Sequence, residues 1–205
     1  MSNILYKYLD INGAKMMLHY SNLMYANATT FNDPLDCHPS IIDFSNIPND
    51  ECKVWPANVI KSLRTNRHNL IREKIWICCL SKLYNSLLMW SYYNKHEGIC
   101  IGLNMDNVAK YLHPKLGQIV ITRGEDVKYK NIVNKPNYYR DKENFFKYQV
   151  FTKAKAWKHE QEVRLFVYEP NPFCMGLLPF QKDIKESINI KEVRIFPKIG
   201  NECFE

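Results

Sequence analysis

Residues 74–81 (KIWICCLS) constrain the fold most, because they form a continuous apolar run of strand length. A strand with one face in water alternates polar and apolar residues, whereas this run has no polar face. The sequence therefore predicts a strand that is buried on both sides. With 205 residues, 46% of them hydrophobic, the chain is long enough to bury such a strand in one core.

The other hydrophobic patterns predict short strands and short helices in irregular order. Strands are expected over residues 4–9, 22–26, 99–103, 118–122, 161–168 and 190–197, with another near Val127. Helices are expected over residues 13–20, 56–73, 86–93, 106–112 and 142–152, and turns over 29–39. Without a regular strand–helix alternation, the pattern indicates an α+β fold with a mixed or antiparallel sheet, in one domain over residues 1–205.

The composition limits which kinds of partner and which cellular compartment we expect for the protein. The 28 Lys and Arg residues against 21 Asp and Glu give a net charge of +7. That excess favours an anionic partner (nucleotide, nucleic acid or anionic lipid), or serves solubility alone. The chain has neither a membrane-length apolar run nor a signal-like start, so we expect a cytoplasmic protein with no membrane partner. The seven cysteines lack a C-x-x-C pair, so neither a disulfide framework nor a metal site is expected; Cys78, Cys79 and Cys100 are expected in the core.

The alternation of residues 161–168 places Val163 and Leu165 on one side of a strand. If the segment is extended from residue 160 onward, Glu160, Glu162 and Arg164 share the other side. Two carboxylates and a guanidinium on a rigid strand are suited to a functional site. The alternative is a set of Glu–Arg pairs on a solvated face.

Two further segments carry candidate binding residues. Trp90 and Tyr93 are three residues apart and share a helix face, with His96 near its end, so they can hold a planar ring or anchor the helix in the core. Asn32 and Asp33 precede a proline in a turn that either contacts a ribose or amide ligand or holds only its own backbone.

Basic residues occur in two stretches. Lys61, Arg64, Arg67, His68 and Arg72 fall close to one helical face, and residues 128–158 interleave cations with aromatic rings. These patterns are typical of nucleic-acid contact, but a solvated helix face and core packing also explain them. The motifs of serine hydrolases, P-loop NTPases and zinc enzymes are absent from the sequence.

Four motifs in order resemble a widespread prokaryotic family described only as a domain of unknown function. They are Leu5-Tyr6-Lys7-Tyr8, then FNDPLD at residues 31–36, then the stretch from Met89 to Gly102, and last WKHEQEVR at residues 157–164. The resemblance extends to about Phe166, and the sequence after Glu192 departs from the family pattern. This resemblance implies a shared fold but no established activity.

Three of the same parts are similar, in the same order, to the ADP-ribosyltransferase fold. They are a basic and aromatic first strand (Tyr6-Lys7-Tyr8), a middle aromatic segment (residues 90–93) and a late Glu160-x-Glu162. The resemblance implies an enzyme that uses NAD as a substrate and modifies protein or nucleic acid, as a toxin or antiphage effector. The competing class is a non-catalytic nucleic-acid-binding domain or a nuclease-like defence domain.

The same resemblance implies a role for each candidate residue. Cleaving the nicotinamide–ribose bond develops positive charge on the sugar, which Glu162 would stabilise while Glu160 orients the acceptor nucleophile. The other candidates would bind NAD. Tyr6 or Tyr8, with Trp90 or Tyr93, would stack on nicotinamide; Lys7, Arg164 or His96 would meet the pyrophosphate or ribose; and Asn32 and Asp33 would shape the pocket mouth.

Overall fold

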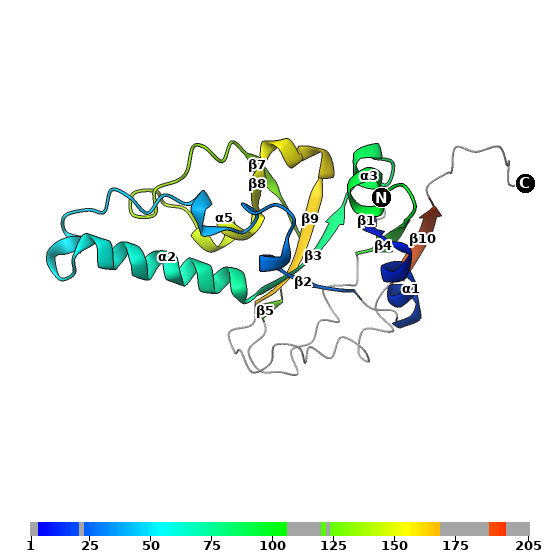
Figure 1. Ribbon diagram of the computed structural model, residues 1–205, viewed down its shortest axis with the longest axis horizontal. Coiled ribbons are helices and arrows are strands. Elements are labelled where there is room, and N and C mark those ends of the chain that lie inside the picture. Colours follow the sequence, from blue (N-terminus) through cyan, green and yellow to red (C-terminus); the bar gives the residue numbers. More distant parts are fainter. Residues whose placement is uncertain (1–3, 21–22, 106–119, 122–123, 169–188, 196–205) are drawn as a thin grey trace, which may run out of the picture.

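The computed structural model describes residues 4–20, 23–105, 120–121, 124–168 and 189–195. Its main feature is an antiparallel sheet whose strand path is β10-β4-β1-β3-β9-β5, with β2 paired to β3 and β6 paired to β9 (Figure 1). A separate parallel pair joins β7 and β8. Helices and this sheet together confirm the predicted α+β class.

The bounds of the elements agree closely with the hydrophobic pattern. The strands are β1 (Ile4–Leu9), β2 (Ala26–Asn27), β3 (Ile75–Ser81), β4 (Ile99–Asn104), β5 (Val120–Ile121), β6 (Glu125–Asp126), β7 (Lys128–Lys130), β8 (Thr152–Ala154), β9 (Glu162–Tyr168) and β10 (Asn189–Ile195). The α-helices are α1 (Ile11–Tyr20), α2 (Ala57–Glu73), α3 (Leu87–Asn94) and α5 (Phe145–Phe151). The 3-10 helices are η1 (Ala28–Thr30), η2 (Pro39–Ile41), η3 (Glu51–Lys53) and η4 (Lys155–Glu160).

A few expectations need correction. The strand expected over 22–26 is the two-residue β2, and two short strands, β6 and β7, flank Val127. Residue 160 is not extended: it ends the helix η4, and Gln161 turns the chain with a φ of 42° before β9 begins. The helix expected over 106–112, together with the ends of the strands expected over 118–122 and 190–197, lies outside the described residues.

The central strand β3 is covered on both faces, as its apolar sequence predicts. On one face, Cys78 and Leu80 join Val163 and Leu165 of β9 in a core that also holds Ala14 of α1. On the other face, Ile75 and Ile77 pack with Phe166 of β9 and with Val150 and Phe151 of α5. Two separate cores therefore fix the sheet from both sides.

The sheet is split between its two central strands. β3 and β9 pair at every position from Ile75 to Ser81, and β1 and β4 pair along their whole length. By contrast, β1 and β3 pair at Tyr6 and Ser81. The Lys7 ammonium crosses the split and donates a hydrogen bond of 2.9 Å to the carbonyl of Cys79. Backbone groups and side chains are thus available on both edges of the opening.

The helix α2 extends from the sheet along the long axis of the molecule (Figure 1). It starts after Pro56, which suits a helix start, and ends at Glu73, so that Lys74 alone separates it from β3. Ile60 and His68 are its buried residues, so it contacts the rest of the molecule along a narrow stripe. No helix in the described ranges is both long and apolar enough to cross a membrane.

Candidate active site

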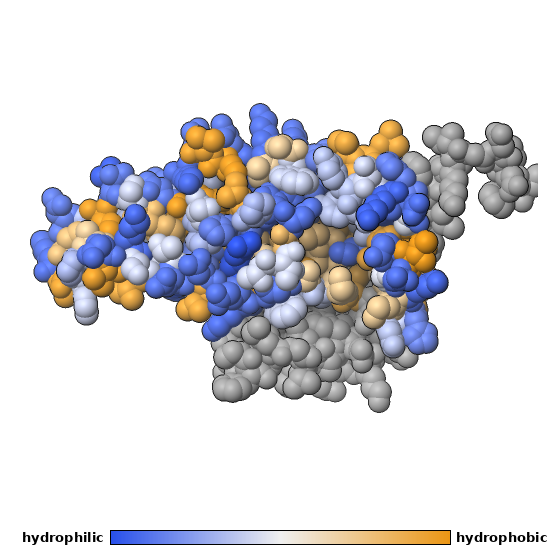
Figure 2. Space-filling model, in the orientation of Figure 1, coloured by the Kyte–Doolittle hydropathy of each residue, from blue (hydrophilic) through white to orange (hydrophobic). Residues whose placement is uncertain are grey.

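A pocket of about 320 Å³ opens where the sheet is split. Its volume falls in the range of small-molecule sites, and hydrophobic surface lies among hydrophilic patches near the middle of the face in Figure 2. The lining comes from β1, from β3, from α3, from residues 24–36 around η1, and from β8 through the start of β9. The residues are Tyr6, Lys7, Tyr8, Met24, Ala26, Thr30, Phe31, Asn32, Asp36, Ile77, Cys79, Leu80, Ser81, Met89, Tyr93, Lys153, Glu160 and Glu162.

Behind the lining, Arg164 is fully buried, and all five of its N–H groups are used. The guanidinium forms bidentate pairs with Asp36 (2.8 and 2.7 Å) and with Glu162 (2.8 and 3.0 Å). Its remaining N–H donates to the carbonyl of Val150 at 2.6 Å. Because these partners fix its position completely, Arg164 holds the Glu162 carboxylate in one orientation at the pocket wall.

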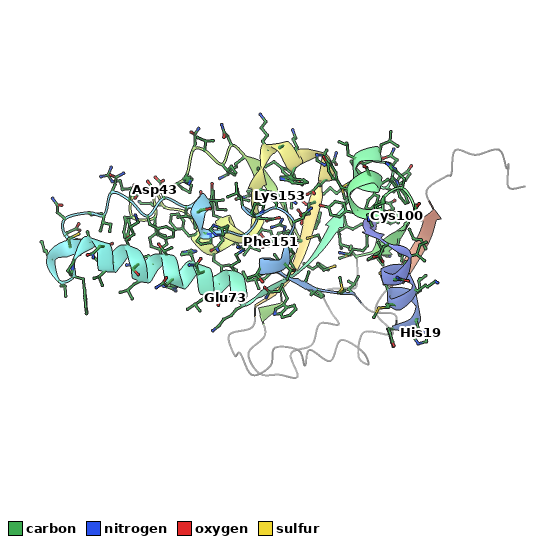
Figure 3. The ribbon with its side chains drawn as sticks, viewed as in Figure 1. His19, Asp43, Glu73, Cys100, Phe151 and Lys153 are labelled. Carbon is green, nitrogen blue, oxygen red and sulfur yellow. The ribbon has the colours of Figure 1, made fainter. Side chains whose placement is uncertain are left out.

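Lys153 is the second buried cation of the site, and Figure 3 shows it beside β9. Its ammonium lies 2.6 Å from Glu160, 3.4 Å from Glu162 and 3.5 Å from Asp36. Glu160 also accepts a hydrogen bond from the Tyr93 hydroxyl, and that tyrosine is 37% exposed. Glu160 therefore connects the buried charges with the mouth of the pocket.

The turn that carries both carboxylates is fixed by hydrogen bonds to its backbone. The Ser81 hydroxyl donates to the carbonyl of Glu160 at 2.7 Å, and the amide of Glu162 donates to the Tyr129 hydroxyl at 2.8 Å. Held at both ends, Glu160 and Glu162 are preorganised before any ligand binds.

The surroundings of the two carboxylates move their pKa values in opposite directions. Burial by itself raises the pKa of Glu162, but the charges of Arg164 and Lys153 outweigh it and lower the pKa to about 2. Burial also raises the pKa of Glu160, and here the repulsion from Glu162 adds to it, so the net shift is upward despite Lys153. One carboxylate is thus held ionised while its neighbour is prepared to take up a proton.

The structure brings most of the predicted site residues together. Seven of the eleven candidates line the pocket: Tyr6, Lys7, Tyr8, Asn32, Tyr93, Glu160 and Glu162. They come from four segments far apart in the chain: residues 6–8, Asn32, Tyr93, and residues 160–162. The proposed solvated strand face is wrong, since Glu162 and Arg164 are buried rather than exposed.

Four candidates lie outside the lining. Trp90 is buried against Tyr8, with ring centroids 5.2 Å apart, and its indole N–H donates to the carbonyl of Tyr84, so it anchors the helix α3 in the core. Asp33 is buried and accepts a hydrogen bond from the amide of Leu35, so its side chain holds its own turn. His96 is exposed beyond the end of α3, and Arg164 stands behind Glu162.

Of the lining residues that were not named as candidates, three carry ionisable groups. Asp36 and Lys153 complete the buried charges, and Cys79 lines the pocket instead of lying wholly in the core. Asp36 is the last residue of the FNDPLD motif, so the motif could have indicated it as a site residue. No sequence signal singled out Lys153, because it is one of many cations in the stretch 128–158, whose pattern favours nucleic-acid contact.

The basic and aromatic stretch 128–158 makes many contacts within the protein. Lys147 pairs with Glu125 at 2.7 Å, Lys130 lies 3.8 Å from Glu143, and Lys153 is buried in the site. Among the described residues, no group of three or more His, Cys, Asp or Glu side chains is arranged to hold a metal ion.

Comparison of the chain with protein-family models, with curated proteins and with solved structures finds no match. The fold and the pocket define an α+β protein with a buried charge cluster at a split in its sheet.

Proposed function

We propose that the pocket binds NAD as a substrate and that the protein is an ADP-ribosyltransferase-like enzyme of the cytoplasm. The observation that carries this proposal is the pair of neighbouring carboxylates, Glu160 and Glu162, whose pKa values are moved apart at one pocket wall. Transfer of the ADP-ribosyl group from NAD requires one carboxylate that stays ionised and a second one that can accept a proton.

The reaction assigns one step to each carboxylate. The bond between the nicotinamide nitrogen and the ribose C1′ breaks, and its electron pair leaves with nicotinamide. Glu162, ionised at neutral pH, stabilises the positive charge that develops on the sugar and accepts a hydrogen bond from the 2′-hydroxyl. An acceptor X–H then forms the X–C1′ bond, and its proton passes to Glu160.

The remaining lining supports a ligand with a planar ring. Tyr6, Tyr8 and Phe31 place aromatic surface in the pocket, and Tyr93 stands at its mouth beside Glu160. Rings of this kind stack on a nicotinamide. Trp90 contributes indirectly in this scheme, by supporting the ring of Tyr8.

The test is the release of nicotinamide from NAD by the purified protein. We expect Glu162→Gln to lower the rate about 100-fold or more, because it removes the charge that stabilises the transition state. Glu73→Gln, at an exposed glutamate at the end of α2, is the matched control and should keep the full rate. Glu160→Gln should release nicotinamide but fail to transfer ADP-ribose to an acceptor.

Binding provides a second readout, because Glu162 also has structural partners. NAD should raise the melting temperature of the wild-type protein. If NAD neither binds nor turns over, the proposal is wrong. Oligonucleotide cleavage that stops on chelation of divalent cations would then favour the nuclease-like alternative.

A further inference from the structure

Three aromatic rings form a cluster outside the pocket, which we call the rim cluster: Tyr92 of α3 with Trp157 and His159 of η4. The Tyr92 centroid lies 5.9 Å from that of Trp157 and 5.8 Å from that of His159, and the last two are 6.0 Å apart. Tyr92 is 58% exposed, so the cluster presents a ring to solvent.

The rim cluster is directly connected to the site. Tyr93, the next residue after Tyr92, lines the pocket and donates to Glu160. Trp157 contacts the buried charges, since the Lys153 ammonium lies 4.9 Å from its ring centroid. A molecule stacked on the rim cluster would thus lie beside the carboxylate to which we assign the acceptor's proton.

The charge around the rim cluster is positive. Across residues 87–97 and 155–160 the exposed charged side chains are Lys95, Lys155 and Lys158 against Glu97. None of these three lysines forms an ion pair with a described residue, and Glu160, the other acid in these segments, is buried. The surface therefore complements an anionic partner.

We propose that the rim cluster and its lysines bind single-stranded nucleic acid, and that this strand is the acceptor of the ADP-ribosyl group. Unpaired bases stack on exposed aromatic rings, and lysines neutralise the phosphates between them. A duplex keeps its bases stacked on each other, so none of them is available to stack on Tyr92. The role as acceptor rests on the proposed function, whereas binding of the strand does not.

The binding test uses fluorescence anisotropy with short labelled single strands of mixed sequence, as DNA and as RNA, in the absence of NAD. Tyr92→Ala should weaken binding at least about fivefold, and Tyr92→Phe should retain it. The double variant Lys155→Ala/Lys158→Ala should weaken binding about tenfold or more. It should also reduce the slope of log affinity against log salt by about 1.4, the effect of two lost phosphate contacts.

The matched control is Lys61→Ala/Arg67→Ala, which removes two exposed charges from α2 and should bind as the wild type does. All the substituted side chains are exposed, so the variants should fold. Equal losses in the rim and control variants, or preference for a duplex, would overturn the inference. So would transfer of label from NAD to a protein but to no oligonucleotide. Strand binding at the rim without nicotinamide release would instead refute the proposed function and leave the binding site standing.

Discussion

Glu160 and Glu162 differ in what their charge does to the stability of the fold. The pKa of Glu162 is about 2 in the folded protein against an ordinary value of 4.5, so its ionised form stabilises the fold at every pH above 4.5. Glu160 has a raised pKa, so its ionised form destabilises the fold at neutral pH. We expect Glu162→Gln to lower the free energy of unfolding at neutral pH by about 3 kcal/mol, and Glu160→Gln to leave it unchanged or raise it.

Urea unfolding at several pH values measures both effects. As the pH falls from about 5 to about 2, the wild type loses the contribution of Glu162, so its advantage over Glu162→Gln should shrink. Glu160 gains its proton in the same direction, so its unfavourable contribution should disappear as the pH falls. Losses of stability of similar size in both variants at neutral pH would contradict the assigned charge states.

Local sequence predicts which residues face the site better than it predicts their partners. Alternation along β9 correctly separates Val163 and Leu165 from Glu162 and Arg164. It does not reveal whether the polar face meets water, because that depends on Asp36, a partner 128 positions away from Arg164. The pairing of Arg164 with that aspartate is a property of the tertiary fold.

At the scale of elements, the join between α3 and β4 depends on Gly98. A Cβ atom at this position would lie 2.3 Å from the carbonyl oxygen of Leu9 and 2.5 Å from the Cβ of Asn94. Since the first contact is with backbone, Gly98→Ala forces the start of β4 away from the end of β1. We expect it to lower the free energy of unfolding by about 3 kcal/mol.

Gly13→Ala is the matched control for this prediction. Its added Cβ would lie 3.1 Å from the Asp10 Oδ1, which accepts a hydrogen bond from the Gly13 amide. This exposed side chain needs to shift by only a few tenths of an ångström, and alanine favours the helix α1. Urea midpoints of the two variants should therefore differ clearly. A small loss for Gly98→Ala, equal to that of Gly13→Ala, would show that the join is looser than the packing indicates.

Hydrophobic periodicity predicts the elements well where it is strong. The run at β3, the alternation at β9 and the helix α2 all match within a residue or two. It fails at residue 160, because the turn at Gln161 is set by contacts with Ser81 and Lys82 of a distant segment. The split between β1 and β3, which creates the pocket, also cannot be predicted from the hydrophobic periodicity of either strand.

Across the whole molecule, buried polar contacts join layers that share little apolar surface. Gln149 of α5 is fully buried and donates to the carbonyls of Cys37 (2.8 Å) and His68 (2.9 Å). Its carbonyl oxygen lies 2.5 Å from the Nδ1 of His68. The apolar contacts of α2 come mainly from the buried Ile60 and the half-buried Ile71, so the Gln149 side chain is a main polar attachment of the helix to the body of the protein.

Gln149→Met keeps the side chain close in size but leaves the Cys37 carbonyl and the His68 Nδ1 without this partner, at a cost of about 1–3 kcal/mol. Because the groups lie between α2 and the rest of the molecule, the cost should appear as local opening of that helix. Amide hydrogen exchange in α2 should become about 5- to 150-fold faster, while β3 and β9 keep their protection. Asn66→Ala, at an exposed position on α2, should change exchange little. Equal acceleration in α2, β3 and β9 would mean that the helix and the sheet unfold as one unit, and that Gln149 stabilises the fold as a whole.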